Sequence, residues 1–293
     1  MLPGMPARAE AKPGIAIVGA GNLANALAAA LHGAAYVIDE IVSRANAASM
    51  NRAQALAREV GASAATIYEA KLRARIVWFC VPDREITRAA ELLIEATDWK
   101  GKVALHSSGA LTSDVLEILR ERGAAVGSIH PLMTFVRGSR PSLEGTPFAL
   151  EGDLKAVRVA RAAVLKLLGQ PFTTRKREKQ AYHAWGMFSS PLLVALLAAA
   201  ERVATAAGIS RDEARRKMLP ILQQTLSNYE RMGAARSFSG PIARGDVETV
   251  RKHLQALQKV PAARRAYAAL ARSALLDLPV KNRTQLEKLL GSV

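Results

Sequence analysis

The sequence predicts an α/β domain built on a doubly wound, mostly parallel sheet, followed by an all-α domain. Three observations support this fold class. β-rich runs alternate with helical patterns through the first half of the chain, those runs are nearly continuous in apolar residues, and they cease after Thr174. Such alternation favours a parallel sheet with helices on both faces, and strands covered on both faces are continuously apolar. A chain of 293 residues is long enough for two domains.

Short apolar runs predict strands over residues 15–18, 36–43, 75–81, 103–106 and 125–130, with two more around Phe148 and Phe172 in the same sheet. Helical periodicity predicts helices between them over 22–31, 50–60, 85–96, 113–122 and 154–168. Further helices are predicted over 177–189, 191–207, 211–232, 247–258, 262–275 and 283–290. We therefore expect a first domain at residues 14–175 and a second at 176–293. Residues 1–13 hold three prolines and no apolar segment, which predicts a disordered extension.

Composition and charge limit the classes of partner. Lysine and arginine number 41 against 25 acidic residues, a net charge of +16, but the basic residues are spread along the chain. No block of five or six like charges is present, so we expect no specific nucleic-acid partner.

The apolar stretch 184–200 is short for a membrane span and rich in small residues. It predicts a buried helix of a cytoplasmic protein with no membrane partner.

The single cysteine, Cys80, lies in an apolar run. One cysteine excludes an intrachain disulfide and a cysteine-based zinc site, and its apolar surroundings indicate a buried structural thiol. We predict no metal site.

A glycine motif closes the first predicted strand and opens the first helix. Residues 19–24 read Gly-Ala-Gly-Asn-Leu-Ala and match the pattern G-x-G-x-x-A. Gly19 suits a tight turn, and Gly21 leaves room for a pyrophosphate to approach the backbone at a helix N-terminus. In this strand–turn–helix context the motif predicts a Rossmann domain with Gly19, Gly21, Asn22 and Leu23 at the dinucleotide. The alternative is a glycine turn that binds nothing.

The end of the second predicted strand indicates which dinucleotide. NAD sites usually place a carboxylate there, for the ribose 2′-hydroxyl. Here Asp39 and Glu40 precede the apolar part of the strand, which ends instead in Ser43 and Arg44. A hydroxyl and a guanidinium suit a 2′-phosphate, so we predict NADP as the cofactor. Arg52 on the next helix would add to this charge. The alternative is that Arg44 is an ordinary surface arginine.

Several motifs together resemble a family. The chain is similar to the uncharacterised Rossmann-like oxidoreductases grouped as domain of unknown function 2520. The resemblance covers nearly the whole chain beyond residue 13, and it rests on residues 19–24, 79–83, 106–110, 128–135, 182–184 and 240–246. The wider superfamily includes pyrroline-5-carboxylate reductases, 3-hydroxyisobutyrate dehydrogenases and deazaflavin-dependent NADP reductases. The resemblance implies an NADP domain, a helical C-terminal domain and a homodimer formed through that domain, but no substrate.

The chain departs from the family at residues 189–191. They read Ser-Ser-Pro where the resemblance leads us to expect Ala-Ser-Asn. The missing amide removes one hydrogen-bonding group from the family's pocket. Ser190 and Pro191 form either an N-cap with proline at the first helical position or a kink in one long helix.

Polar residues follow three of the predicted strands, where ligands of doubly wound sheets bind. Val81 and Pro82 are placed against the nicotinamide side of the cofactor, and Asp83 either joins them or caps the next helix. His106, Ser107 and Ser108 close the fourth strand, and His130 closes the fifth. We assign Ser107 to the cofactor, Ser108 to the substrate and both histidines to catalysis. A structural histidine is the alternative for each.

The helical domain contributes further candidates. Lys179 and His183 are four residues apart and share a helix face with Ser190, so either of the first two could protonate the substrate. Related dehydrogenases use a lysine and an asparagine four apart on the equivalent helix. Arg244 is a candidate for a substrate carboxylate, whereas Asp246 could simply cap the following helix. Ser190 is assigned to the substrate, and a solvated helix face is the alternative for the whole stripe.

These features predict an NADP-dependent oxidoreductase. Hydride would pass between nicotinamide and a small polar, anionic carbonyl or imine substrate. One alternative is a non-catalytic NADP-binding sensor, because the glycine motif serves both. Another is an NADPH reductase of a deazaflavin or flavin.

Overall fold

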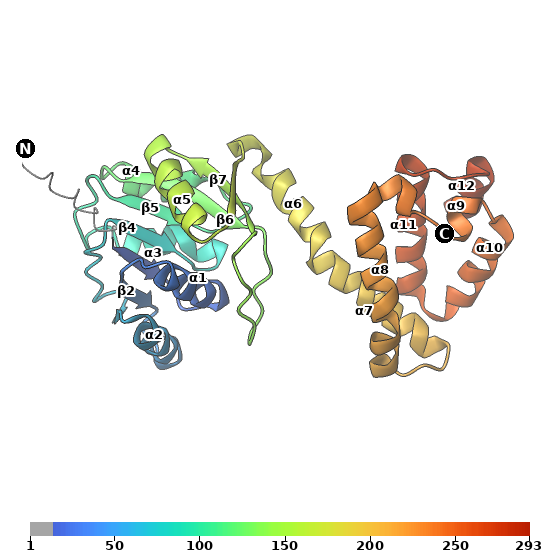
Figure 1. The fold of residues 1–293 in the computed structure, drawn as a ribbon, viewed down its shortest axis with the longest axis horizontal. Coiled ribbons are helices and arrows are strands. Elements are labelled where there is room, and N and C mark those ends of the chain that lie inside the picture. Colours follow the sequence, from blue (N-terminus) through green and yellow to red (C-terminus); the bar gives the residue numbers. More distant parts are fainter. Residues whose placement is uncertain (1–13) are drawn as a thin grey trace, which may run out of the picture. The chain divides into compact units, whose positions relative to one another are not determined.

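The computed structural model describes residues 14–293, so the predicted disordered extension lies outside the described residues. The chain divides into two compact units, one ending at Met187 and one covering Phe188–Val293. The first unit holds the sheet and its covering helices, and the second is helical (Figure 1). This confirms the predicted fold class.

The first unit is built on one eight-stranded sheet with the order β3-β2-β1-β4-β5-β6-β7-β8. The strands are β1 (Ile15–Val18), β2 (Ile38–Ser43), β3 (Ser63–Thr66), β4 (Ile76–Phe79), β5 (Val103–His106), β6 (Ala125–Pro131), β7 (Pro147–Gly152) and β8 (Gln170–Thr173). Strands β1 to β6 are mutually parallel, whereas β7 pairs antiparallel with β6. The first six strands have the order of a dinucleotide-binding Rossmann sheet. The carboxyl ends of β2, β1, β4, β5 and β6 therefore follow one another along one edge.

Helices cover both faces of this sheet. They are α1 (Asn22–Gly33), α2 (Ala47–Val60), α3 (Ile86–Leu92), α4 (Glu117–Arg120) and α5 (Leu154–Lys166). Helices α1, α2 and α5 pack on the face that carries Ile15 and Ile17, whereas α3 and α4 pack on the face that carries Ala16 and Val18. Successive residues of β1 thus enter two different cores, which is why the strand is apolar throughout.

Three local predictions need correction. Strand β3 was not predicted, because the residues Ser-Ala-Ala-Thr of this edge strand carry no alternating apolar pattern. The helices predicted over 85–96 and 113–122 are shorter and each begins with a 3₁₀ turn, Asp83–Glu85 and Ser113–Leu116. The segment between the helices predicted over 211–232 and 247–258 contains a further, four-residue helix, α9 (Pro241–Arg244).

Helix α6 (Lys179–Ser189) follows the sheet, and α7 (Pro191–Ala206), α8 (Arg211–Ser237), α10 (Val247–Ala256), α11 (Pro261–Asp277) and α12 (Arg283–Gly291) complete the chain. The second unit has its own core between α10, α11 and α12. The Ser210 hydroxyl caps α8 by accepting from the Glu213 N–H over 3.3 Å. Gly233 interrupts α8 with a φ of 75°, one residue beyond the predicted end of that helix.

The stretch Lys176–Ala206 is long and apolar enough to cross a membrane by length and composition alone, with a mean hydropathy of 1.4. One such helix is weak evidence for a membrane span. The sequence predicted that this helix is buried. In the single chain this prediction is wrong, because only 6% of the most apolar 18-residue part of the helix is buried. Phe188 and Val194 are among its exposed side chains.

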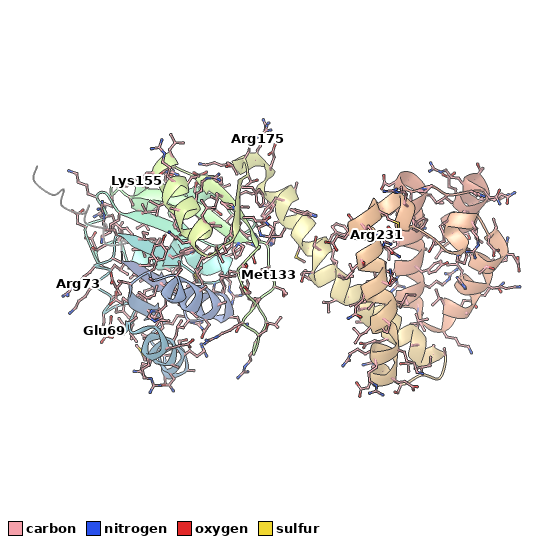
Figure 2. All side chains as sticks on the ribbon, in the orientation of Figure 1. Glu69, Arg73, Met133, Lys155, Arg175 and Arg231 are labelled. Carbon is pink, nitrogen blue, oxygen red and sulfur yellow. The ribbon has the colours of Figure 1, made fainter. Side chains whose placement is uncertain are left out.

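Basic side chains are spread over the described surface rather than gathered in one place. Arg73, Lys155, Arg175 and Arg231 are exposed and come from well-separated segments (Figure 2). This distribution accords with the spread of charge along the sequence.

Candidate active site

The turn between β1 and α1 has the shape that a bound phosphate needs. Gly19 has a φ of +119°, and a Cβ atom there would lie 2.4 Å from the Cys80 carbonyl oxygen, so the fold requires glycine. A Cβ atom on Gly21 would meet nothing within 4 Å. Gly21 is also the N-cap of the 12-residue helix α1 and supplies no side-chain cap. The first N–H groups of α1 therefore face open space with the positive end of the helix dipole.

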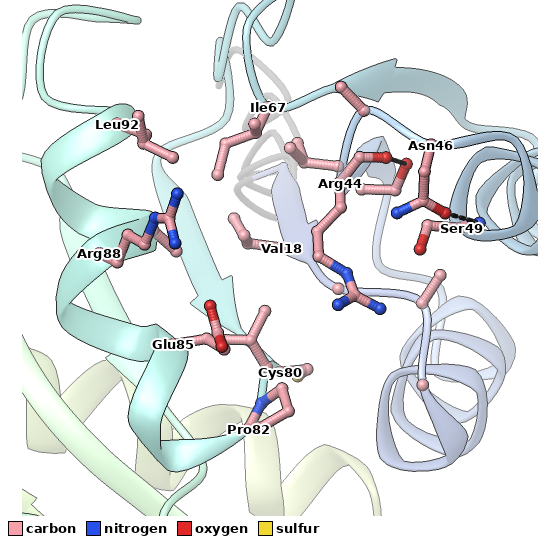
Figure 3. A pocket seen from close by; sticks show the side chains of 18 of the residues that line it. Val18, Arg44, Asn46, Ser49, Ile67, Cys80, Pro82, Glu85, Arg88 and Leu92 are labelled. Atoms are coloured by element: carbon pink, nitrogen blue, oxygen red, sulfur yellow. Dashed lines mark hydrogen bonds between the residues drawn. The ribbon is translucent and has the colours of Figure 1, made fainter.

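A cavity of about 610 Å³ opens beside this turn (Figure 3). It lies at the carboxyl ends of β1, β2 and β4 and is bounded on another side by α3. Six of the predicted cofactor residues line it, namely Gly19, Gly21, Ser43, Arg44, Val81 and Pro82. Its size falls within the range of small-molecule sites, roughly 300–1,000 Å³.

Asn22, Leu23 and Ser107 are cofactor candidates that do not line the cavity. The Asn22 amide donates to the Phe135 carbonyl over 3.2 Å, and Leu23 packs against the core, so both face the ligand only with their backbone. The Ser107 hydroxyl accepts a 2.8 Å hydrogen bond from the Trp78 indole. Ser107 therefore ties β4 to the end of β5.

Three exposed guanidinium groups line the cavity, those of Arg44, Arg52 and Arg88. Arg44 and Arg88 lie on opposite sides of it (Figure 3). Glu85 is the single carboxylate among the lining residues. The Ser43 hydroxyl, which we expected at the 2′-phosphate, donates instead to the Arg44 carbonyl over 3.2 Å. Positive charge therefore dominates this pocket.

The carboxylates of β2 are engaged away from the cavity. Glu40 is buried and accepts from the backbone N–H groups of Lys71 and Leu72 at 3.0–3.3 Å. Neither Asp39 nor Glu40 lines the cavity. The place where NAD sites carry a carboxylate is thus taken by Arg44, as the sequence indicated.

His106 has a structural position rather than a catalytic one. Its side chain is fully buried, Nε2 lies 3.0 Å from the Thr112 carbonyl, and Nδ1 accepts from the Ser108 N–H over 3.1 Å. Burial, reinforced by the charge of Lys179, lowers the pKa of His106 to about 3. A neutral ring with both nitrogens occupied by backbone groups braces the loop after β5, which corrects its assignment to catalysis.

Ser108 also serves this loop rather than a substrate. Its buried hydroxyl donates to Asp83 over 2.7 Å and accepts from the N–H groups of Ala110 and Leu111. No bonding capacity remains for a ligand. Asp83 therefore does not cap the next helix. Its carboxylate joins the end of β4 to the loop after β5.

Lys179 was predicted as a proton donor, but the structure encloses it. The side chain is 0% exposed, and Nζ donates to the Ser108 carbonyl over 3.1 Å and to the Ser128 hydroxyl over 2.5 Å. Burial lowers the pKa of Lys179 to about 8, while the nearby carboxylates of Glu151 and Asp83 oppose the shift. Lys179 therefore fastens α6 to the ends of β5 and β6 and does not reach a substrate.

His130 and His183 meet above Gly109. Their ring centroids are 6.2 Å apart, and a Cβ atom on Gly109 would lie 2.9 Å from His130 Nε2 and 2.7 Å from His183 Cδ2. Burial, with the charges of Lys179 and His183, lowers the pKa of His130 to about 4. Both rings are half-buried, and neither residue lines the cavity beside Gly21.

Tyr182 is a residue of this cluster that the sequence analysis missed. Its hydroxyl lies 2.7 Å from His130 Nδ1, across 52 positions in the chain. Burial raises the pKa of Tyr182 to about 12. The one sequence signal was its place beside His183 in a family-like motif.

Ser190 and Arg244 belong to the second unit. Ser190 is the N-cap of α7 and Pro191 its first residue, and the Ser190 side chain makes no capping hydrogen bond. Arg244 is exposed at the end of α9. Asp246 caps α10 by accepting from the Thr249 N–H over 3.0 Å, as its capping alternative proposed. The structure does not assemble Ser190 or Arg244 with the residues around Gly109 in a single unit.

Comparison with known proteins identifies both parts of the chain. Residues 6–131 match a Rossmann-like domain, and residues 146–274 match the family described as Domain of unknown function (DUF2520). No curated protein matches the chain.

Solved structures share the fold at low sequence identity. Protein TM1727 from Thermotoga maritima is 25% identical, covers 95% of this chain and 98% of its own, and has a TM-score of 0.69. BF3122 from Bacteroides fragilis, described as an NADP oxidoreductase, is 23% identical with 89% and 97% coverage and a TM-score of 0.75. An imine reductase from Pseudomonas sp. is 23% identical with 94% and 99% coverage and a TM-score of 0.62. In its two parts the chain is therefore similar to a Rossmann-like domain and, after it, to the domain of unknown function 2520.

Proposed function

We propose that the chain is an NADP-dependent oxidoreductase that transfers hydride between nicotinamide and a small polar carbonyl or imine compound. One observation carries this proposal. The open N-terminus of α1 at Gly21 and the guanidinium of Arg44 share one cavity, at the ends of neighbouring strands β1 and β2. A helix N-terminus binds a pyrophosphate, and an arginine beside it accommodates a 2′-phosphate.

The sheet order supports a direction for the bound cofactor. From β2 to β6 the edge spans four strand spacings, on the order of 19 Å. A dinucleotide extended from Arg44 would run past Gly21 toward Val81 and Pro82, which line the far part of the cavity. NADPH bound in this way supplies the hydride. The Asp83–Ser108 bond and the Lys179 contacts hold the loop that carries Gly109 next to this end. His130 and His183 are then the side chains placed to orient a substrate.

The resemblance in fold to an NADP oxidoreductase and an imine reductase accords with this proposal. Arg244 stays our candidate for a substrate carboxylate, because it is exposed and uncommitted to the core of the second unit.

We also propose that the protein is cytoplasmic and forms a homodimer. Exposed apolar side chains on α7 and α8 support a partner surface there.

Cofactor choice is tested by titrating NADPH and NADH calorimetrically into the wild-type protein and Arg44→Ala. Loss of a charge-assisted contact costs about 1.5–3 kcal/mol, so NADPH affinity should fall about 10- to 100-fold while NADH affinity stays the same. Arg58→Ala is the matched control, since Arg58 is exposed on α2 but does not line the cavity.

Two results would contradict the proposal in different ways. Absence of binding by either nucleotide would remove the cofactor site altogether. Unchanged discrimination in Arg44→Ala would remove Arg44 as the selecting group while leaving the pocket in place. Tight NADPH binding without oxidation across carbonyl, imine, flavin and deazaflavin acceptors would favour a sensor.

A further inference from the structure

The contact between Tyr182 and His130 is enclosed on several sides. Tyr182 is 9% exposed, and its ring packs edge-on against Phe172 and Trp185 as well as against His130. Its hydroxyl lies 2.7 Å from His130 Nδ1. Water therefore does not compete strongly for this bond, and the chemistry of the two groups decides which one donates.

A neutral imidazole has one N–H donor and one bare nitrogen acceptor. With the pKa of His130 lowered to about 4 and that of Tyr182 raised to about 12, both groups are neutral near pH 7. A phenol is a better donor than a neutral imidazole N–H, and a bare imidazole nitrogen is a better acceptor than a phenol oxygen. The Tyr182 O–H therefore donates to Nδ1, and the hydrogen of His130 is left on Nε2.

His130 Nε2 faces Gly109, whose absent side chain would lie 2.9 Å away. Burial and the charge of Lys179 both disfavour a positive charge on His130. Among residues 14–293, no third histidine, cysteine or acidic residue joins His130 and His183 in a metal-binding group. The partly exposed His130 ring thus offers an Nε2–H donor beside the positive charge of Lys179.

We propose that Tyr182 is a positioning residue that fixes His130 as an Nε2–H donor, and that this donor selects an uncharged carbonyl oxygen over a cationic imine. The inference rests on the proposed function, whose substrate class it narrows. A carbonyl oxygen accepts the Nε2–H bond and is polarised by it. A protonated imine carries its own N–H and a positive charge, so it would face both a second donor and like charges.

The tautomer can be read directly by nitrogen NMR of the full chain with ¹⁵N-labelled histidine. The sequence has only five histidines, and His130→Gln identifies the signal. We expect a protonated Nε2 and a bare Nδ1 on His130 at pH 7 in the wild-type protein. Tyr182→Phe should abolish this preference and give a mixture of both tautomers. A wild-type His130 protonated on Nδ1, or an unchanged tautomer in Tyr182→Phe, would overturn the proposal.

The chain offers a matched control for this substitution. His253 Nδ1 lies 3.1 Å from the Tyr267 hydroxyl, a second histidine–tyrosine pair within the second unit. Tyr267→Phe should change the His253 signals and leave those of His130 as they are. Because the wild-type tautomer is itself decisive, the test does not depend on the folding of either variant.

Substrate class is tested with two ring compounds of similar size, cyclopentanone and protonated pyrrolidine, added to the protein with NADP⁺. Cyclopentanone should shift the His130 Nε2 signal, and pyrrolidinium should not. Tyr182→Phe should weaken cyclopentanone binding about twofold, because about half of the His130 rings would then lack the Nε2–H donor. A response to pyrrolidinium alone, or to neither compound, would overturn the assignment of a carbonyl substrate. Calorimetric NADPH binding, measured separately, shows whether the cofactor proposal itself has failed.

Discussion

Lys179 is a lysine that the folded chain surrounds completely, and its charge should make stability depend on pH. Burial lowers its pKa from 10.5 to about 8. Between these values the unfolded chain holds the proton and the folded chain does not, so the free energy of unfolding should rise with pH from about 8 to 10.5. The cost of burying the charge is fully present below pH 8. It amounts to at most about 3 kcal/mol.

Lys179→Met should remove this rise. The measurement is urea unfolding at intervals between pH 7.5 and 10.5 for the wild-type protein and the variant, because other groups that titrate in this window cancel in the difference. Lys176→Met is the control, since Lys176 is exposed three positions earlier, and the rise should persist in it. If the pH slopes of wild type and Lys179→Met coincide, Lys179 is not held as the contacts suggest.

For individual residues, the sequence did not predict the direction in which each side chain points. Strand-end position made His130 a candidate, and helical spacing placed Lys179 and His183 on one face. The spacing could not say that the lysine enters the protein to meet Ser108 while the histidine stays half-buried. The Tyr182–His130 pair depends on how α6 lies against β6, and no local pattern encodes a contact across 52 positions.

At the scale of elements, the two glycines of the turn between β1 and α1 have different roles. The fold requires Gly19, whereas a bound pyrophosphate requires Gly21. Gly19→Ala places a methyl group against the Cys80 carbonyl at a positive φ, so it should lower stability by about 1–3 kcal/mol. Gly21→Ala places a methyl group in open space, so its melting temperature should match wild type. Its NADPH affinity should nevertheless fall at least about tenfold, because the pyrophosphate needs that space.

Thermal melting and calorimetry on both variants check this pair, and each serves as the control for the other. Equal loss of stability in both would mean that Gly21 is also structural. Full NADPH affinity in Gly21→Ala would place the pyrophosphate elsewhere.

Elements with strong periodicity were predictable, and weak ones were not. Strands β1 and β5 lie where their apolar runs placed them, because burial on both faces leaves a continuous signal. Strand β3 is an edge strand of small and polar residues, and α9 is a single turn that begins after a glycine and at a proline. Such short elements are stabilised by their neighbours rather than by their own pattern, so sequence periodicity does not reveal them.

At the scale of the whole molecule, the second unit exposes apolar side chains that need a covering surface. Leu192 and Leu196 are four residues apart on α7, and Leu219 and Leu226 are seven apart on α8, so each pair lies along one face of its helix. All four are exposed in the single chain. Monomeric proteins rarely leave such stripes open to water, and homodimer interfaces are typically built from them.

We therefore expect light scattering after gel filtration to give twice the mass of one chain. Leu226→Glu should shift the equilibrium toward the monomer, because it would bury an unpaired charge at the interface. Leu154→Glu is the control, since Leu154 is an equally exposed apolar residue on α5 of the first unit. Each copy carries a net charge of +16, so the two copies repel and added salt should strengthen the dimer by screening that repulsion. A monomer at all salt concentrations, or a dimer that Leu226→Glu leaves intact, would mean that these stripes are covered in some other way.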